Sequence, residues 1–364
     1  MSDNLFDRLF ELLQTPGPVN WRLGKEITGS LAGAAEPIEP KLAEEYQELT
    51  LAAQLRLADG LSLDVSTTKT IHPVDRRTWA ERNEQSFRYL IEPLSGKLGG
   101  GSGAGSPLLA PMAPLILGMQ AGTMLGFMSH RVLGQFDTGL PALDHDSLFL
   151  VVPNVETFAQ DHEIEPQQVR MWAVLREVTS HAILSVEWVR DYFIRAITGF
   201  YDTVEFDPSA LMDMLGGLQD PSSLADPSAL EGLVDEPNGL ARLLGSSHDP
   251  AALEPIQAFL AFVEGFGDYA VRTAADELMP QLGEIESAVR LRRSEPNEAE
   301  QFLQQLLGLR IDRHRADDAA GFCSDVARRW GAGTLEHLWD EPDKLPRLGE
   351  LTDAVGWAAR VLLD

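Results

Sequence analysis

The sequence is poor in cysteine, with Cys323 alone among 364 residues. A single thiol cannot form an intramolecular disulfide, and it excludes a metal site built from several cysteines. An isolated cysteine commonly packs as a small apolar side chain, so we expect Cys323 to be buried.

Basic residues are also scarce, because 29 lysines and arginines stand against 56 aspartates and glutamates, giving a formal net charge of −27. A negative field of this size repels nucleic acid and anionic lipid, so neither is expected as a partner. No acidic run is long enough to form a tail, which places most of this charge on the solvated surface. The charge does not exclude a peptide or a protein as the binding partner, and the sequence identifies no particular partner.

Long apolar runs are rare as well. The stretch 107–129 contains no charged residue, and its length and its glycine spacing would suit a membrane helix: Gly118, Gly122 and Gly126. Two prolines interrupt its first part, however, and no aromatic or basic cluster flanks it. We therefore expect no membrane span, but a buried helix that a second helix crosses closely. The N-terminus carries Asp3 and Asp7 and lacks the apolar core of a secretion signal, so a cytoplasmic protein is expected.

The densest chemical pattern lies in the stretch 171–193, which is predicted to form one long helix. Its apolar residues recur at intervals of three and four, as one buried helix face requires: Met171, Leu175, Val178, Ala182, Val186 and Val189. Pro166 suits the first turn of this helix.

Residues 176–180 of this helix (Arg-Glu-Val-Thr-Ser) occupy the five-residue frame of a His-Glu-x-x-His zinc motif. The motif needs imidazoles at positions one and five to bind one zinc ion, and its glutamate activates the zinc-bound water. Only Glu177 is present, while Arg176 and Ser180 stand in the histidine positions. His181 is no substitute in a regular helix, because it lies about 140° around the axis from residue 176. On its own, so partial a match is also typical of an ordinary helix.

Further segments give this partial match a context, because most of the chain resembles a family of bacterial zincin-like proteins, described as proposed hydrolases or metallopeptidases. The segments that carry the resemblance are 73–94 (PVDRRTWAERNEQSFRYLIEPL), 125–141 (LGFMSHRVLGQFDTGLP), 148–159 (LFLVVPNVETFA), 171–193, 259–271 (FLAFVEGFGDYAV) and 302–322 (FLQQLLGLRIDRHRADDAAGF). Most members of the family show His-Glu-x-x-His in the central helix.

The resemblance implies that Glu177 matches the general base of the family and that Glu264 matches its downstream acidic zinc ligand. Arg176 and Ser180 depart from the pattern and remove two of the three expected ligands. We therefore expect no metal and no other cofactor here, although zinc is the cofactor of the related family. We also expect Arg176 to replace the metal as the cation, paired with Glu264, with Glu177 or with both.

The rest of the chain predicts mainly helices. The stretches 74–92 and 253–278 are expected to be helical, residues 147–152 form the best strand, and Asn154 is expected to cap a short helix after it. His130 is expected to be a hydrogen-bonded interior histidine, and residues 286–293 are expected to form a solvated basic patch.

These elements predict a mostly α fold with a minor β element and a zincin-like pair of core helices. We divide the chain into an N-terminal helical part (1–98), a glycine-rich loop (99–106), a core with the motif helix (107–200) and a helical C-terminal part that completes the site (201–364).

Three functional hypotheses follow from this reading. The first is a hydrolase-related zincin-like protein that is inactive because Arg176 and Ser180 replace two ligands. The second is an active metal-dependent hydrolase with unconventional ligands drawn from Glu177, His181, Glu264 and Asp268. The third is a non-enzymatic structural or interaction protein that keeps only the scaffold.

Overall fold

The chain is described by a computed structural model over residues 17–61, 63–66, 71–98, 113–137, 140–142, 148–204, 250–275, 279–294 and 314–363. The predicted glycine-rich loop at 99–106 and most of the segment between the central helix and residue 250 lie outside these residues.

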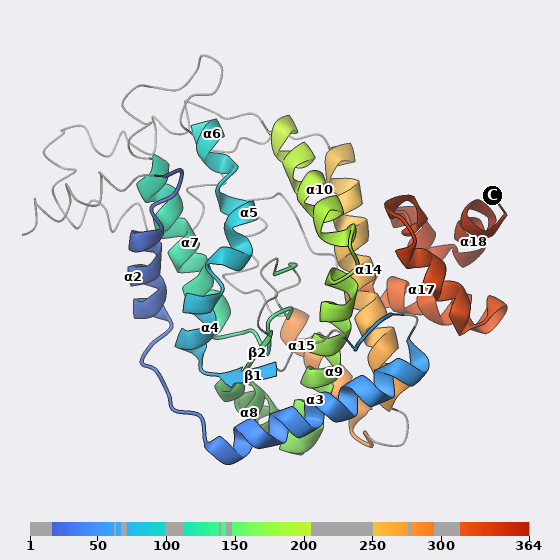
Figure 1. Ribbon diagram of the computed structural model, residues 1–364, viewed down its shortest axis with the longest axis horizontal. Coiled ribbons are helices and arrows are strands. Elements are labelled where there is room, and N and C mark those ends of the chain that lie inside the picture. Colours follow the sequence, from blue (N-terminus) through green and yellow to red (C-terminus); the bar gives the residue numbers. More distant parts are fainter. Residues whose placement is uncertain are drawn as a thin grey trace, which may run out of the picture.

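The described residues confirm a mostly helical fold with a small β element (Figure 1). The α-helices are α2 (Trp21–Leu31), α3 (Pro40–Gly60), α4 (Arg76–Arg82), α5 (Arg88–Ile91), α6 (Leu94–Leu98), α7 (Ala113–Ser129), α8 (Val152–Asp161), α9 (Pro166–Leu184), α10 (Val189–Thr203), α14 (Pro250–Ala275), α15 (Leu282–Ser294), α17 (His314–Trp330) and α18 (Ala354–Leu362). Short 3-10 helices complete the set: η1 (Gln85–Phe87), η4 (Ala332–Trp339), η5 (Pro342–Lys344) and η6 (Leu348–Thr352).

Helix α9 lies at the centre of the arrangement. It contacts α14 on one side and α8 on another, and the long helix α3 runs across both α9 and α14 (Figure 1). On its far side α14 packs against α17, which in turn contacts α18. Because one continuous apolar core joins these helices, α9 is buried on all its faces from Trp172 to Leu184, and not only on the single predicted face. Cys323 on α17 is buried in the same core, as expected.

Strands β1 (Ile71–Val74) and β2 (Leu148–Val151) pair to form a two-stranded parallel sheet. Ile71 pairs with Leu148 and Val74 with Val151. The sequence predicts β2 but not β1, and the single helix predicted over 74–92 is wrong. That stretch contains the last residue of β1, then α4, η1 and α5. Pro73 makes this strand difficult to predict from the sequence, because proline is rare in central strands. An edge strand tolerates it.

The predicted helix over 171–193 is also wrong in its second half. Helix α9 ends at Leu184, and α10 begins at Val189 after a short turn. The amide of Ser185 still donates to the carbonyl oxygen of His181, and the amide of Val186 donates to that of Ile183. No glycine or proline marks the turn, and the apolar periodicity continues through it, so the local signals for a helix end are missing.

The predicted close crossing of the glycine-rich helix is present. Helix α2 packs along α7, and Gly122 lies so close to the backbone of Gly24 that a Cβ atom on it would clash. The hydroxyl of Thr28 donates to the carbonyl oxygen of Gly122 across this contact at 3.2 Å. Within the described residues, no helix combines the length and apolar character that a membrane span requires.

Asn154 does not cap α8, because the helix begins two residues earlier and Asn154 lies inside its first turn. Its side-chain amide donates instead to two backbone carbonyl oxygens at the end of α7, those of Ser129 (2.8 Å) and Val132 (2.7 Å). This residue therefore ties α8 to the segment that follows α7.

Candidate functional site

The site is built on two consecutive residues of α9 that point in different directions. Successive helical residues lie about 100° apart around the axis, so neighbouring side chains face different surroundings. Arg176 reaches α14, whereas Glu177 reaches the loop that follows α7. Both residues are buried.

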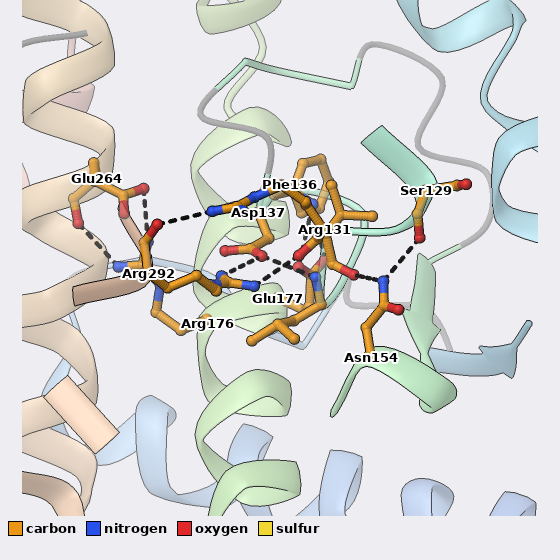
Figure 2. Close-up of polar contacts among 11 residues, drawn as sticks. Ser129, Arg131, Phe136, Asp137, Asn154, Arg176, Glu177, Glu264 and Arg292 are labelled. Carbon is orange, nitrogen blue, oxygen red and sulfur yellow. Dashed lines mark hydrogen bonds and ion pairs between the residues drawn. The ribbon is translucent and has the colours of Figure 1, made fainter. Parts of the chain in front are cut away.

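Arg176 lies between two carboxylates of α14. Its Nη2 atom is 2.7 Å from Oε2 of Glu264, and its Nη1 atom is 2.7 Å from Oδ1 of Asp268. Nη1 also donates to the backbone carbonyl oxygen of Glu264 at 2.9 Å (Figure 2). The predicted pairing of Arg176 with Glu264 is therefore present, and Asp268 is a second partner. Residues 264 and 268 share one helix face, which is why a single guanidinium can bind both.

The packing around the guanidinium leaves little space. Gly267 lies directly against Nη1 of Arg176, and a Cβ atom at this position would meet it at 2.5 Å. The ring of Trp172 lies on another side, with its centroid 5.9 Å from the guanidinium carbon. A glycine inside a helix costs about 1 kcal/mol relative to alanine, and here it makes room for the arginine.

The electrostatics of this cluster depend on the arginine. The side chain of Arg176 is 9% exposed, and those of Glu264 and Asp268 are 20% and 15% exposed. Burial raises the pKa of Asp268, and the positive charge of Arg176 opposes that rise. Arginine suits this position because its fork binds carboxylates at fixed geometry and stays charged when buried.

Glu177 is enclosed by the loop after α7. Its two carboxylate oxygens lie 3.1 and 3.3 Å from the backbone nitrogen of Phe136, which donates to them. Gly134 lies against the same carboxyl group, where a Cβ atom would overlap it. Of the alternatives expected for Arg176, the pairing with Glu264 is therefore the one present, while the carboxyl group of Glu177 is bound by the loop.

Burial raises the pKa of Glu177 to about 8. The N–H group of Phe136 opposes the rise, and the nearby charge of Asp137 adds to it. The carboxyl group is thus largely protonated at neutral pH.

Two further polar side chains lie in the motif frame or directly after it. Ser180 and His181 are both buried, and Nδ1 of His181 lies 3.4 Å from the hydroxyl of Ser185. Among the described residues, no three His, Cys, Asp or Glu side chains are grouped so that they could hold a metal ion.

These residues do not fit a zinc ion. Zinc binds neutral imidazoles, thiolates and carboxylates, whereas a guanidinium is a cation that cannot coordinate it. Here the guanidinium already neutralises the two carboxylates of α14, which a metal would need. The geometry brings Arg176, Glu264 and Asp268 together, but it leaves Glu177 in a separate environment.

The sequence did not predict the loop that encloses Glu177, and it did not predict Asp268 as a partner of Arg176. The spacing of four residues after Glu264 could have revealed Asp268 as a partner on the same face. No local pattern identifies Gly134 or Phe136 as neighbours of Glu177, because these contacts join residues far apart in the sequence, 41 positions in the case of Phe136.

A buried helix with the zinc-motif frame, facing a later helix that presents carboxylates, defines a zincin-like scaffold. The zincin-like metallopeptidase family matches residues 19–358, and the chain belongs to this family. A crystal structure from Chloroflexus aurantiacus, described as a proposed hydrolase with a novel fold, shares the fold. Its TM-score is 0.68 at 21% identity, over 95% of this chain and 99% of that one. No functionally curated protein gives a significant match.

Proposed function

We propose that this chain is a hydrolase-related zincin-like protein in which an arginine has replaced the catalytic metal, so that it does not catalyse metal-dependent hydrolysis. The observation that carries the proposal is the position of Arg176 between Glu264 and Asp268, with nitrogen–oxygen distances of 2.7 Å to each. A guanidinium and a zinc ion are both cations, and either can neutralise these carboxylates.

The surroundings of Glu177 support the same proposal. In the related family this position holds the general base, but here the carboxyl group is enclosed by the loop at Gly134 and Phe136. The roles that we propose are therefore those of a remnant site: Arg176 as the internal cation, Glu264 as a former ligand position, and Glu177 as a former general base. The division that we propose for the chain places Arg176 in the core at 107–200 and Glu264 in the C-terminal part at 201–364.

The test is a zinc titration of the full chain and of the variant Arg176→His/Ser180→His. We expect the unaltered chain to retain no stoichiometric zinc after dialysis. The double variant restores the motif frame, so it should bind one zinc ion per chain and melt at a higher temperature with zinc than with chelator, because a metal that binds only the native state stabilises it.

Two controls separate metal binding at the site from adventitious binding. Each single variant, Arg176→His or Ser180→His, supplies one imidazole and should bind zinc far more weakly. Adding Glu264→Gln to the double variant should remove the third ligand and abolish the zinc-dependent rise in melting temperature. One zinc ion per unaltered chain, removable by chelator with loss of stability, would refute the proposal.

A further inference from the structure

A pocket of about 350 Å³ has a lining that includes neither Arg176 nor its two partners on α14. It is formed by α4, the end of α7, α8 and α15, and its charged and polar lining includes Arg76, His130, Arg131, Asn154, His162 and Arg292. Figure 2 shows three of these residues, Arg131, Asn154 and Arg292. The pocket is thus separate from the carboxylates of α14.

Arg76 is held in the pocket by a neutral group. Its Nε atom donates to the side-chain oxygen of Asn154 at 2.7 Å. The amide nitrogen of Asn154 is occupied by the carbonyl oxygens of Ser129 and Val132, so the asparagine is fixed in orientation and fixes Arg76 in turn. No described acidic side chain forms an ion pair with Arg76, and its positive charge is therefore directed to the pocket without a carboxylate partner there.

Arg131 and Arg292 line another part of the pocket and bind each other. Each donates to the backbone carbonyl oxygen of the other, at 2.9 and 2.7 Å. Arg292 also pairs with Asp137 at 2.7 Å and lies over the ring of Phe158. The basic patch predicted to be solvated at 286–293 thus turns one of its arginines inward, where its guanidinium is held in place before any ligand arrives.

Two histidines also line the pocket. His130 is exposed and not interior as expected, and its Nε2 atom lies 2.8 Å from the carbonyl oxygen of Leu31. His162 stacks on Phe158, with ring centroids 4.7 Å apart.

The charge balance of the pocket is opposite to that of the chain. Its lining contains three arginines but one acid, Asp161, and the pair of Arg292 with Asp137 offsets one of the three positive charges, while the chain as a whole carries a formal charge of −27. Placing several guanidinium groups around one cavity is unfavourable through their mutual repulsion unless an anion offsets it. Three arginines around one pocket of an acidic protein therefore point to an anionic ligand.

We propose that this pocket binds the phosphate group of a small-molecule ligand. Guanidinium groups recognise phosphate through paired charge-assisted hydrogen bonds, and several cations suit a dianion better than a singly charged carboxylate. The volume of about 350 Å³ lies at the lower end of the range for small-ligand sites, and it exceeds the space that one phosphate fills. The pocket can thus hold a phosphate together with part of the molecule that carries it. This inference is independent of whether the Arg176 site binds metal.

The test is calorimetric titration of the full chain with inorganic phosphate and, in parallel, with acetate, at constant ionic strength. Phosphate should bind at least tenfold more tightly than acetate. The variant Arg76→Gln should weaken phosphate binding by about tenfold, since it removes a charge-assisted contact. The matched control is Arg77→Gln on the same helix, because Arg77 pairs with Glu81 outside the pocket, and its affinity should stay within about twofold.

A second variant keeps the test decisive if Arg76→Gln disturbs the fold. Asp161→Asn removes the acid of the lining at an exposed position at the end of α8, so it should tighten phosphate binding by about twofold to fivefold. Misfolding cannot produce such a gain. Undetectable phosphate binding, acetate binding as tight as phosphate binding, an equal loss in the Arg77→Gln control, or no gain in Asp161→Asn would each overturn the proposal.

Discussion

The two sides of α9 bury carboxylates in two different ways. On the α14 side, Glu264 and Asp268 share the guanidinium of Arg176. On the loop side, Glu177 accepts from the backbone N–H group of Phe136, and burial raises its pKa to about 8. One side thus offsets negative charge with an internal cation, and the other removes the charge by holding a proton. The comparison teaches that a buried carboxyl group can be accommodated either by a neighbouring cation or by a raised pKa that keeps it protonated.

The largest effect is expected from breaking the cation side. Arg176→Ala leaves Glu264 and Asp268 without their cation, and removing one partner of a buried pair costs roughly 3–5 kcal/mol, less whatever the partial exposure of the two acids relieves. The measurement is the free energy of unfolding in urea. The control is Arg272→Ala on the same helix, whose pair with Glu286 is more exposed and should contribute about 0–1 kcal/mol. Equal losses in the two variants would contradict the central role of Arg176.

An intermediate effect is expected from crowding the proton side. Gly134→Ala places a methyl group against the carboxyl group of Glu177, where the glycine now lies. Overpacking of a buried contact costs about 1–3 kcal/mol. Chemical denaturation should show this loss, and the second change Glu177→Ala should relieve part of it by opening space. If Glu177→Ala makes the loss larger instead, then the loop does not pack on Glu177 as described.

The smallest effect on stability, for a change of one pH unit, is expected from removing the proton of Glu177. The pKa of Glu177 rises from an unfolded value of about 4.5 to about 8 in the native state, so the native chain holds one more proton between these pH values. Its stability is therefore highest below the unfolded pKa and falls as the pH rises towards the folded pKa, by about 1.4 kcal/mol per pH unit.

Glu177→Gln isolates this contribution. Glutamine resembles the protonated carboxyl group and does not titrate, so the variant should lose the part of the pH dependence that Glu177 causes. Unfolding free energies of both proteins, measured between pH 5 and pH 8 in steps, provide the comparison. An unchanged slope in the variant would mean that Glu177 is ionised in the native state.

The sequence predicted those parts of the fold that depend on local pattern. The close crossing at Gly122, the strand at Leu148–Val151 and the mostly helical architecture each carry a signal within a few residues. Two elements were mispredicted because their signals were absent or misleading. The turn between α9 and α10 contains no helix breaker, and Pro73 concealed the edge strand β1.

For the candidate site, the sequence alone determined which residues stand in the motif frame, and hence that an arginine and a serine replace two imidazoles. It also indicated that Arg176 needs an acidic partner, because a buried guanidinium cannot lose its charge. Only the tertiary structure decided which acids it meets and which acid remains protonated. That choice depends on how α14 and the loop after α7 pack against α9, and such contacts between distant segments leave no periodic trace in the chain. The same holds for the arginine pocket, whose lining comes from four separate elements.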